Sequence, residues 1–140
     1  MDKAEKLLKL FLIFGAMYFL AVSLVHMLAV KVPGLYIYFN IPSHIYQDRI
    51  ISVLAFGWAV FMMTASRQPL RYMPFIKALL VAGSMAVIGL AAINLTTEFT
   101  ELTTEANPIF YWVPVGVLGL YLILMIVFYI RIKVKSAWES

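Results

Sequence analysis

Residues 11–30 read FLIFGAMYFLAVSLVHMLAV, a stretch of twenty residues without an aspartate, glutamate, lysine or arginine. Because an α-helix rises about 1.5 Å per residue, a stretch of this length spans the hydrocarbon core of a bilayer, which is about 30 Å thick. It is longer than the apolar region of a signal peptide, and Lys31, Val32 and Pro33 follow it in place of a small-residue cleavage pattern. We therefore predict a membrane-spanning helix that is retained in the protein.

Three further apolar stretches follow the first. Together, the four stretches predict helices at 7–30, 48–65, 75–95 and 109–132. Apolar residues make up 64% of the 140-residue chain and charged residues 13%, whereas a typical soluble domain is about 45–50% apolar. A soluble domain of this size could not bury so much apolar surface. We predict an all-α integral membrane protein in which residues 1–140 form one domain, a four-transmembrane-helix up-down bundle.

The distribution of basic residues predicts the orientation of the helices. Nine of the eleven basic residues lie on one predicted side: Lys3, Lys6, Lys9, Arg67, Arg71, Lys77, Arg131, Lys133 and Lys135. The other side carries only Lys31 and Arg49. Because lysine and arginine accumulate on the cytoplasmic side, we predict that both termini are cytoplasmic and that the membrane is a bacterial inner membrane. The basic residues flank apolar segments and form no continuous stripe, so the net charge of +4 does not indicate a nucleic-acid partner.

Small residues recur at helical spacing and predict where helices pack, because association in lipid depends on close approach of the backbones. The third and fourth predicted helices carry this set: Ala78, Ala82, Gly83, Ala86, Gly89, Gly116 and Gly119. The first helix offers Gly15 and Ala16, and the second offers Ser52, Ala55 and Ala59. These faces predict either packing within the bundle or docking on a partner protein, and the pattern alone does not distinguish the two.

Ionisable side chains inside a membrane are candidate functional groups, because charge is costly to bury in hydrocarbon. The middles of the predicted helices contain no aspartate, glutamate, lysine or arginine, which argues against a proton-coupled transporter. His26 lies within the first predicted helix, near its outer end, and His44 is the only other histidine. Since imidazole is a common haem ligand, His26 and His44 are candidate cofactor-binding residues in a haem or quinone site. The structural alternative is an imidazole at the headgroup level that hydrogen-bonds to a loop.

A group of polar residues falls on the predicted outer side: Asp48, Arg49, Glu98, Glu101 and Glu105. Asp48 can cap or begin the second helix, where a carboxylate stabilises free amides and the helix dipole. The three glutamates would share one face if their connection were helical, which predicts a solvated acidic face. The alternative is a divalent metal site formed by Asp48 and the three glutamates with His26 and His44, but these residues lack a tight ligand spacing such as His-x-x-x-His.

The sequence supports three functional hypotheses. It contains no cysteine, which excludes thiol chemistry, and no phosphate-loop or hydrolase motif. The leading hypothesis is a non-enzymatic accessory, anchoring or assembly subunit of a larger membrane complex. The alternatives are a haem- or quinone-binding redox anchor, and a small oligomeric channel or transporter for an uncharged or lipid-like solute. The expected partners are the lipid bilayer and other membrane subunits or further copies of the chain.

Overall fold

The computed structural model describes the backbone of residues 3–138 and the side chains of residues 3–135. The helices are α1 (Lys3–Met27), α2 (Ile45–Arg67), α3 (Met73–Thr96), α4 (Phe99–Leu102) and α5 (Pro108–Trp138). Within this part of the chain, four of them are long and apolar enough to cross a membrane, and no strand is present. The prediction of an all-helical chain with four membrane-spanning helices is therefore confirmed at this level, and the chain has the features of a membrane protein.

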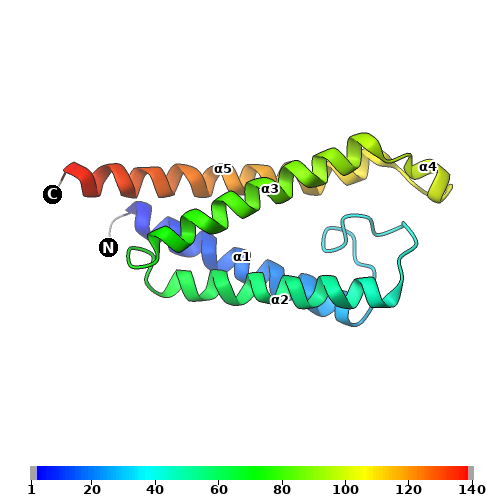
Figure 1. The fold of residues 1–140 in the computed structure, drawn as a ribbon, viewed down its shortest axis with the longest axis horizontal. Helices are drawn as coiled ribbons and strands as arrows, with labels where there is room; N and C mark the ends of the chain where they lie inside the picture. Colours follow the sequence, from blue (N-terminus) through cyan, green and yellow to red (C-terminus); the bar gives the residue numbers. More distant parts are fainter. Residues whose placement is uncertain (1–2, 139–140) are drawn as a thin grey trace.

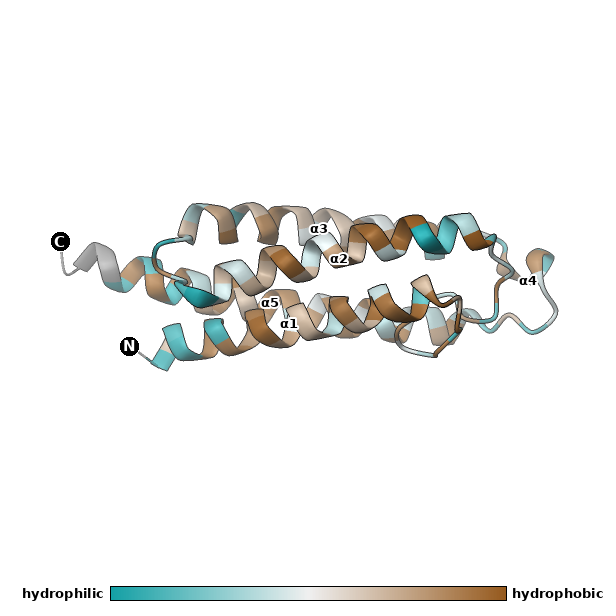
Figure 2. Ribbon diagram, turned by 90° about the horizontal axis from the view of Figure 1, so that it is seen from below, coloured by the Kyte–Doolittle hydropathy of each residue, from teal (hydrophilic) through white to brown (hydrophobic). Residues whose placement is uncertain are grey.

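The polar residues lie at the two ends of the molecule and the apolar residues lie between them (Figure 2). The start of α1 and the end of α5 lie at one end, and α4 lies at the other (Figure 1). The helices form two pairs, α1 with α2 and α3 with α5, and the pairs meet through contacts between α1 and α5.

The helix ends differ from the predicted bounds. α1 begins at Lys3 and ends at Met27, although apolar residues continue to Val30. The chain leaves the helix at Ala29, whose positive φ of 52° is the left-handed conformation that commonly ends helices. α5 continues beyond the predicted end at 132, because lysine is a good helix former in water and the helix need not stop where the apolar stretch ends. α4 adds one helical turn in the connection that holds the glutamates.

α1 and α2 pack along a seam of small and polar residues. The seam residues of α2 recur at spacings of three and four: Asp48, Ser52, Ala55, Ala59, Met62 and Ser66. This spacing keeps one face of a helix against a neighbouring helix. On α1, Gly15 lies so close to α2 that an added β-carbon would be 2.6 Å from Met62 Sδ. The small residues that predicted packing of the first two helices are all buried: Gly15, Ala16, Ser52, Ala55 and Ala59.

α3 and α5 bury much less of their surface than the first pair. Buried residues are 17% of the apolar window of α3 and 11% of that of α5, against 33% in α1 and α2. Gly83 and Gly119 face the contact, where added β-carbons would lie 3.2 Å from Leu122 Cδ1 and 3.8 Å from Val87 Cγ1. The other small residues predicted to pack are exposed on this chain: Ala78, Ala82, Ala86, Gly89 and Gly116.

The apolar core lies toward the end of the molecule that holds the start of α1. Its buried members are Leu8, Leu12, Ala16, Met62, Ala65, Ile76, Leu79, Leu80, Met125 and Ile132. They come from the first halves of α1 and α3 and the second halves of α2 and α5. Near this core the phenol of Tyr121 donates a hydrogen bond to the backbone carbonyl of Phe11 at 2.6 Å and links α5 to α1. The helices are therefore packed most closely at one end.

Candidate functional site

The opposite end of the α1–α2 pair holds a buried histidine and a buried aspartate. His26 lies at the end of α1 and Asp48 in the first turn of α2, and the two residues are 6% and 4% exposed. His26 Nδ1 lies 3.4 Å from Asp48 Oδ1, within the range of an ion pair. The geometry is not that of a hydrogen bond, and Nδ1 has no other partner among the described residues. The contact is therefore electrostatic and joins the ends of two helices.

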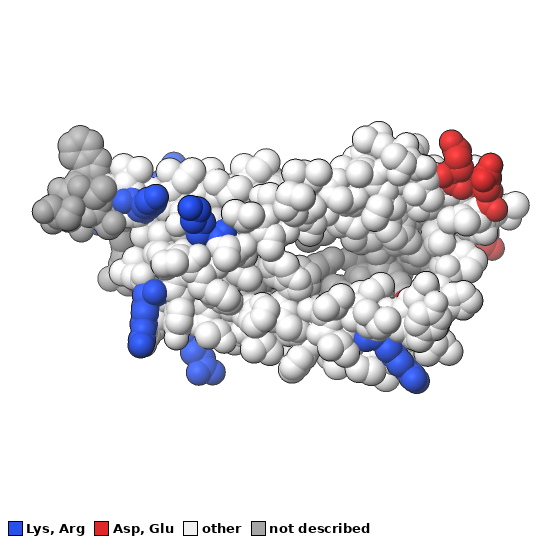
Figure 3. Space-filling model, in the orientation of Figure 1, with Lys and Arg blue, Asp and Glu red and all other residues white. Residues whose placement is uncertain are grey.

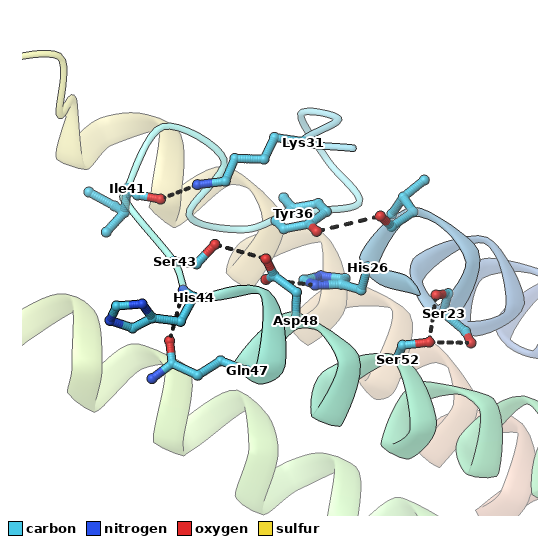
Figure 4. Close-up of polar contacts among 11 residues, drawn as sticks. Ser23, His26, Lys31, Tyr36, Ile41, Ser43, His44, Gln47, Asp48 and Ser52 are labelled. Atoms are coloured by element: carbon cyan, nitrogen blue, oxygen red, sulfur yellow. Dashed lines mark hydrogen bonds and ion pairs between the residues drawn. The ribbon is translucent and has the colours of Figure 1, made fainter. Parts of the chain in front are cut away.

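Tyr36 covers this pair from the loop formed by residues 28–44. Its ring stacks on the imidazole of His26 with a centroid separation of 3.6 Å, and it is 4% exposed (Figure 4). Burial raises the pKa of the Tyr36 phenol, and the nearby charge of Asp48 raises it further, so the phenol remains protonated. Ser43, from the same loop, donates a hydrogen bond of 3.0 Å to Asp48 Oδ2. The loop therefore seals the pair from the medium.

A second polar contact lies deeper in the same seam. Ser52 Oγ donates to the backbone carbonyl of Ser23 at 2.8 Å, and the two hydroxyl oxygens are 3.2 Å apart. Both serines are buried, and each lies about one helical turn from a member of the His26–Asp48 pair. Buried polar groups that are paired in this way fix the register of two helices, because a shift would leave them without partners.

The structure does not bring His44 to His26. His44 is exposed at the start of α2, where its backbone amide donates to Gln47 Oε1 at 3.3 Å. Its ring stacks on Tyr46, and it points away from the Asp48 carboxylate (Figure 4). The two imidazoles therefore do not face one another across a common space.

The predicted outer polar residues divide between two environments. Asp48 is buried beside His26, whereas Arg49 is exposed on the outside of α2. Glu98, Glu101 and Glu105 are exposed in and around α4. No group of three metal-ligating side chains occurs among the described residues. Asp48 and the glutamates therefore do not form one cluster.

A hydrogen-bond network joins the 28–44 loop to the α3–α5 pair. Tyr38 donates to Asn94 Oδ1 at 2.8 Å, and Asn94 Nδ2 donates to the carbonyl of Tyr111 at 3.1 Å. The fully buried Tyr111 donates in turn to Asn40 Oδ1. Tyr38 and Tyr111 also pack against Phe99 of α4, with centroids 5.2 and 4.8 Å away. The loop therefore connects both helix pairs at the end where the apolar core is absent.

The sequence analysis did not identify Tyr36, Tyr38, Asn40, Asn94 or Tyr111 as members of one site. The available signal was the concentration of tyrosine and asparagine near predicted helix ends on one side. Sequence position alone did not show that these side chains contact one another, because they lie on three separate elements, the 28–44 loop, α3 and α5.

No family model, curated protein or solved structure matches this chain. Its function is therefore inferred from its own residues and contacts. The polar groups at the end of the molecule near α4 are arranged chiefly to hold elements together. A carboxylate and an imidazole that are sealed by an aromatic ring can stabilise a fold, but they cannot reach a substrate without movement of the loop.

Proposed function

We propose that this chain is a small non-enzymatic subunit that anchors or helps to assemble a larger membrane protein complex. The observation that carries the proposal is the uneven use of small residues. Those of α1 and α2 are buried in a close contact, whereas Ala78, Ala82 and Ala86 of α3 are exposed in a row along the helix. In lipid such a row favours close approach of another helix, because attraction there comes from packing.

The weak burial of α3 and α5 supports the same proposal. Each of these helices buries a smaller share of its apolar window than α1 or α2. Large apolar side chains such as Val81, Met85 and Ile88 flank the small row of α3 and are 59–64% exposed. Exposed alanines flanked by larger exposed side chains are a surface against which a second transmembrane helix can pack.

The sealed polar groups support a role without catalysis. His26 and Asp48 lie beneath Tyr36. Tyr38 donates to Asn94, Asn94 donates to the carbonyl of Tyr111, and the phenol of Tyr111 donates to Asn40. The separation of the two imidazoles gives less support to a bis-histidine haem anchor, which needs both rings on one iron.

The proposed orientation is an up-down bundle with both termini cytoplasmic, in a bacterial inner membrane. Lysine and arginine side chains gather toward the end that holds the termini, and acidic side chains gather at the opposite end near α4 (Figure 3). This distribution supports the orientation, because basic residues are retained on the cytoplasmic side.

Native mass spectrometry of gently solubilised native membranes tests the proposed function. We expect a species in which this chain is bound to one or more other membrane proteins. A chain found only as a monomer under conditions that preserve other complexes would contradict the proposal. A complex of identical chains alone would replace the accessory role with self-assembly.

A further inference from the structure

A crevice between α1 and α5 extends from the outer end of the molecule to its middle. The crevice has a volume of about 310 Å³, and its walls include Phe14, Tyr18, Val113 and Val117. Gly34 of the 28–44 loop lines its outer end. Phe14, Val113 and Val117 are 58–62% exposed, so the crevice opens sideways on the surface that faces lipid.

The close contact between α1 and α5 forms the floor of the crevice. At this level Gly15 and Tyr121 meet, and a β-carbon on Gly15 would lie 2.3 Å from the phenol oxygen. A second apolar cavity of about 120 Å³ begins on the other side of the same wall and shares Phe19, Leu118 and Tyr121 with the first. The two cavities are therefore adjacent, with these three side chains between them. The surface is also hollowed between the pairs toward the acidic end (Figure 3).

The polar atoms on the crevice walls are already occupied. The phenol of Tyr18 donates to the carbonyl of Gly34 at 3.1 Å, and the phenol of Tyr121 donates to the carbonyl of Phe11 at 2.6 Å. The remaining walls are aliphatic and aromatic side chains and contain no charged residue. An occupant that needs hydrogen bonds, such as the ring of a quinone, finds no free donor there. The walls suit a hydrocarbon chain.

The length of the crevice matches the depth of one leaflet. From Val113 to Tyr121 the helix rises about 12 Å, at about 1.5 Å per residue. One leaflet contributes about 15 Å, which is half of the hydrocarbon thickness. An acyl chain that enters beside Gly34, at the outer end, would reach the floor formed by Gly15 and Tyr121 near the middle of the membrane.

We propose that this crevice binds one acyl chain of an outer-leaflet phospholipid, which fills the space between α1 and α5. The chain binds through close packing, since hydrocarbon gains nothing by transfer from lipid into an apolar crevice. Because no charged residue lines the walls, the site selects for the acyl chain rather than for the headgroup. The choice of the outer leaflet rests on the proposed orientation, but the inference does not depend on the proposed docking role of α3.

The test measures phospholipid retained by the purified full-length chain after extensive washing in mild detergent. Native mass spectrometry and phosphorus analysis are used together on the wild type and on Val117→Trp, whose indole would fill the mouth of the crevice. Val127→Trp is the matched control, because Val127 also faces outward on α5 but lines neither cavity. Circular dichroism and gel filtration show whether each variant is folded.

We expect the wild type and Val127→Trp to retain one phospholipid per chain and Val117→Trp to lose it. After delipidation, phosphatidylethanolamine and phosphatidylglycerol with the same acyl chains should rebind equally well. Retention of the lipid by folded Val117→Trp would overturn the proposal, as would a wild type that retains no phospholipid. A bound isoprenoid quinone in its place would also overturn it. If Val117→Trp does not fold, Leu118→Phe replaces it, since Leu118 lies in the wall that both cavities share.

Discussion

His26 Nδ1 and Asp48 Oδ1 lie 3.4 Å apart, in a contact that joins the last turn of α1 to the first turn of α2. Both side chains are almost fully buried, and the ring of Tyr36 covers them. A buried carboxylate is costly unless neighbouring groups compensate it, and here the imidazole and the hydroxyl of Ser43 do so. The pair therefore contributes to holding the 28–44 loop over the ends of the two helices.

Replacing Asp48 by alanine should destabilise the contact between the end of α1 and the start of α2. His26 and Ser43 would both lose their acidic partner, and we expect the free energy of unfolding to fall by about 1–3 kcal/mol. Asp48→Asn should lower the free energy of unfolding by less, because the amide oxygen can still accept a hydrogen bond from Ser43. Thermal unfolding in detergent measures both effects. Glu101→Ala, which removes an exposed carboxylate, should melt like the wild type; equal melting of Asp48→Ala would show that the pair does not stabilise the fold.

Replacing Gly15 by alanine should separate α1 from α5. The added carbon would lie 2.3 Å from the phenol oxygen of Tyr121 and 2.6 Å from Met62 Sδ. We expect the free energy of unfolding to fall by about 1–3 kcal/mol, as is usual when a side chain is added to a close-packed contact. Tyr121→Phe removes the phenol oxygen and its hydrogen bond to Phe11, at a cost of about 1 kcal/mol.

The double variant Gly15→Ala/Tyr121→Phe distinguishes this contact from a general effect of alanine. If the clash with the phenol oxygen is the cause, the double variant should lose less free energy of unfolding than the two single variants lose together. Gly116→Ala is the control, because nothing lies within 4 Å of its added carbon. Because alanine favours a helix more than glycine does, Gly116→Ala should raise the free energy of unfolding by up to about 1 kcal/mol. Additive losses in the double variant would contradict the proposed clash.

The sequence was sufficient to predict the four long helices, because each needs only an uninterrupted apolar stretch of the right length. It also contained the signal for the α1–α2 contact. The spacing of Ser52, Ala55 and Ala59 places small residues on one face of α2, and Gly15 and Ala16 do the same on α1. Extending that antiparallel alignment outward would have placed Asp48 opposite His26.

The closure of the 28–44 loop could not be predicted in the same way. It depends on the left-handed backbone at Ala29 and Gly34 and on contacts between distant elements, such as Tyr38 with Asn94. Such contacts leave no periodic pattern in the sequence. For the same reason, the sequence did not show that Ala82 is exposed while Gly83 faces α5, since adjacent small residues satisfy the same spacing rule.

Cysteine labelling should establish the proposed orientation, because the natural chain contains no cysteine. In intact cells we expect a membrane-impermeant maleimide to label Thr104→Cys, which is exposed in the connection after α4. Gln68→Cys, exposed in the connection between α2 and α3, should react only after the membrane is opened. Both cysteines should react equally once the cells are permeabilised, which shows that each is accessible. The opposite labelling pattern would require both termini to lie outside.

Replacing Ala82 by leucine should weaken association with a partner while leaving the chain itself folded. Ala82 is exposed on α3, so a larger side chain meets no other part of the described chain, but it would hold a docked helix away from the backbone. We expect the yield of the complex to fall by about tenfold, which corresponds to about 1.4 kcal/mol of binding free energy.

Ala92→Leu is the matched control, because Ala92 is also an exposed alanine of α3 but lies off the row of Ala78, Ala82 and Ala86. Affinity purification from native membranes, with thermal unfolding of the isolated chain, separates a loss of docking from a loss of folding. If Ala82→Leu does not lower the yield of the complex, the partner binds another face of the chain. The next variant to test would then be Leu120→Trp, on the weakly buried surface of α5.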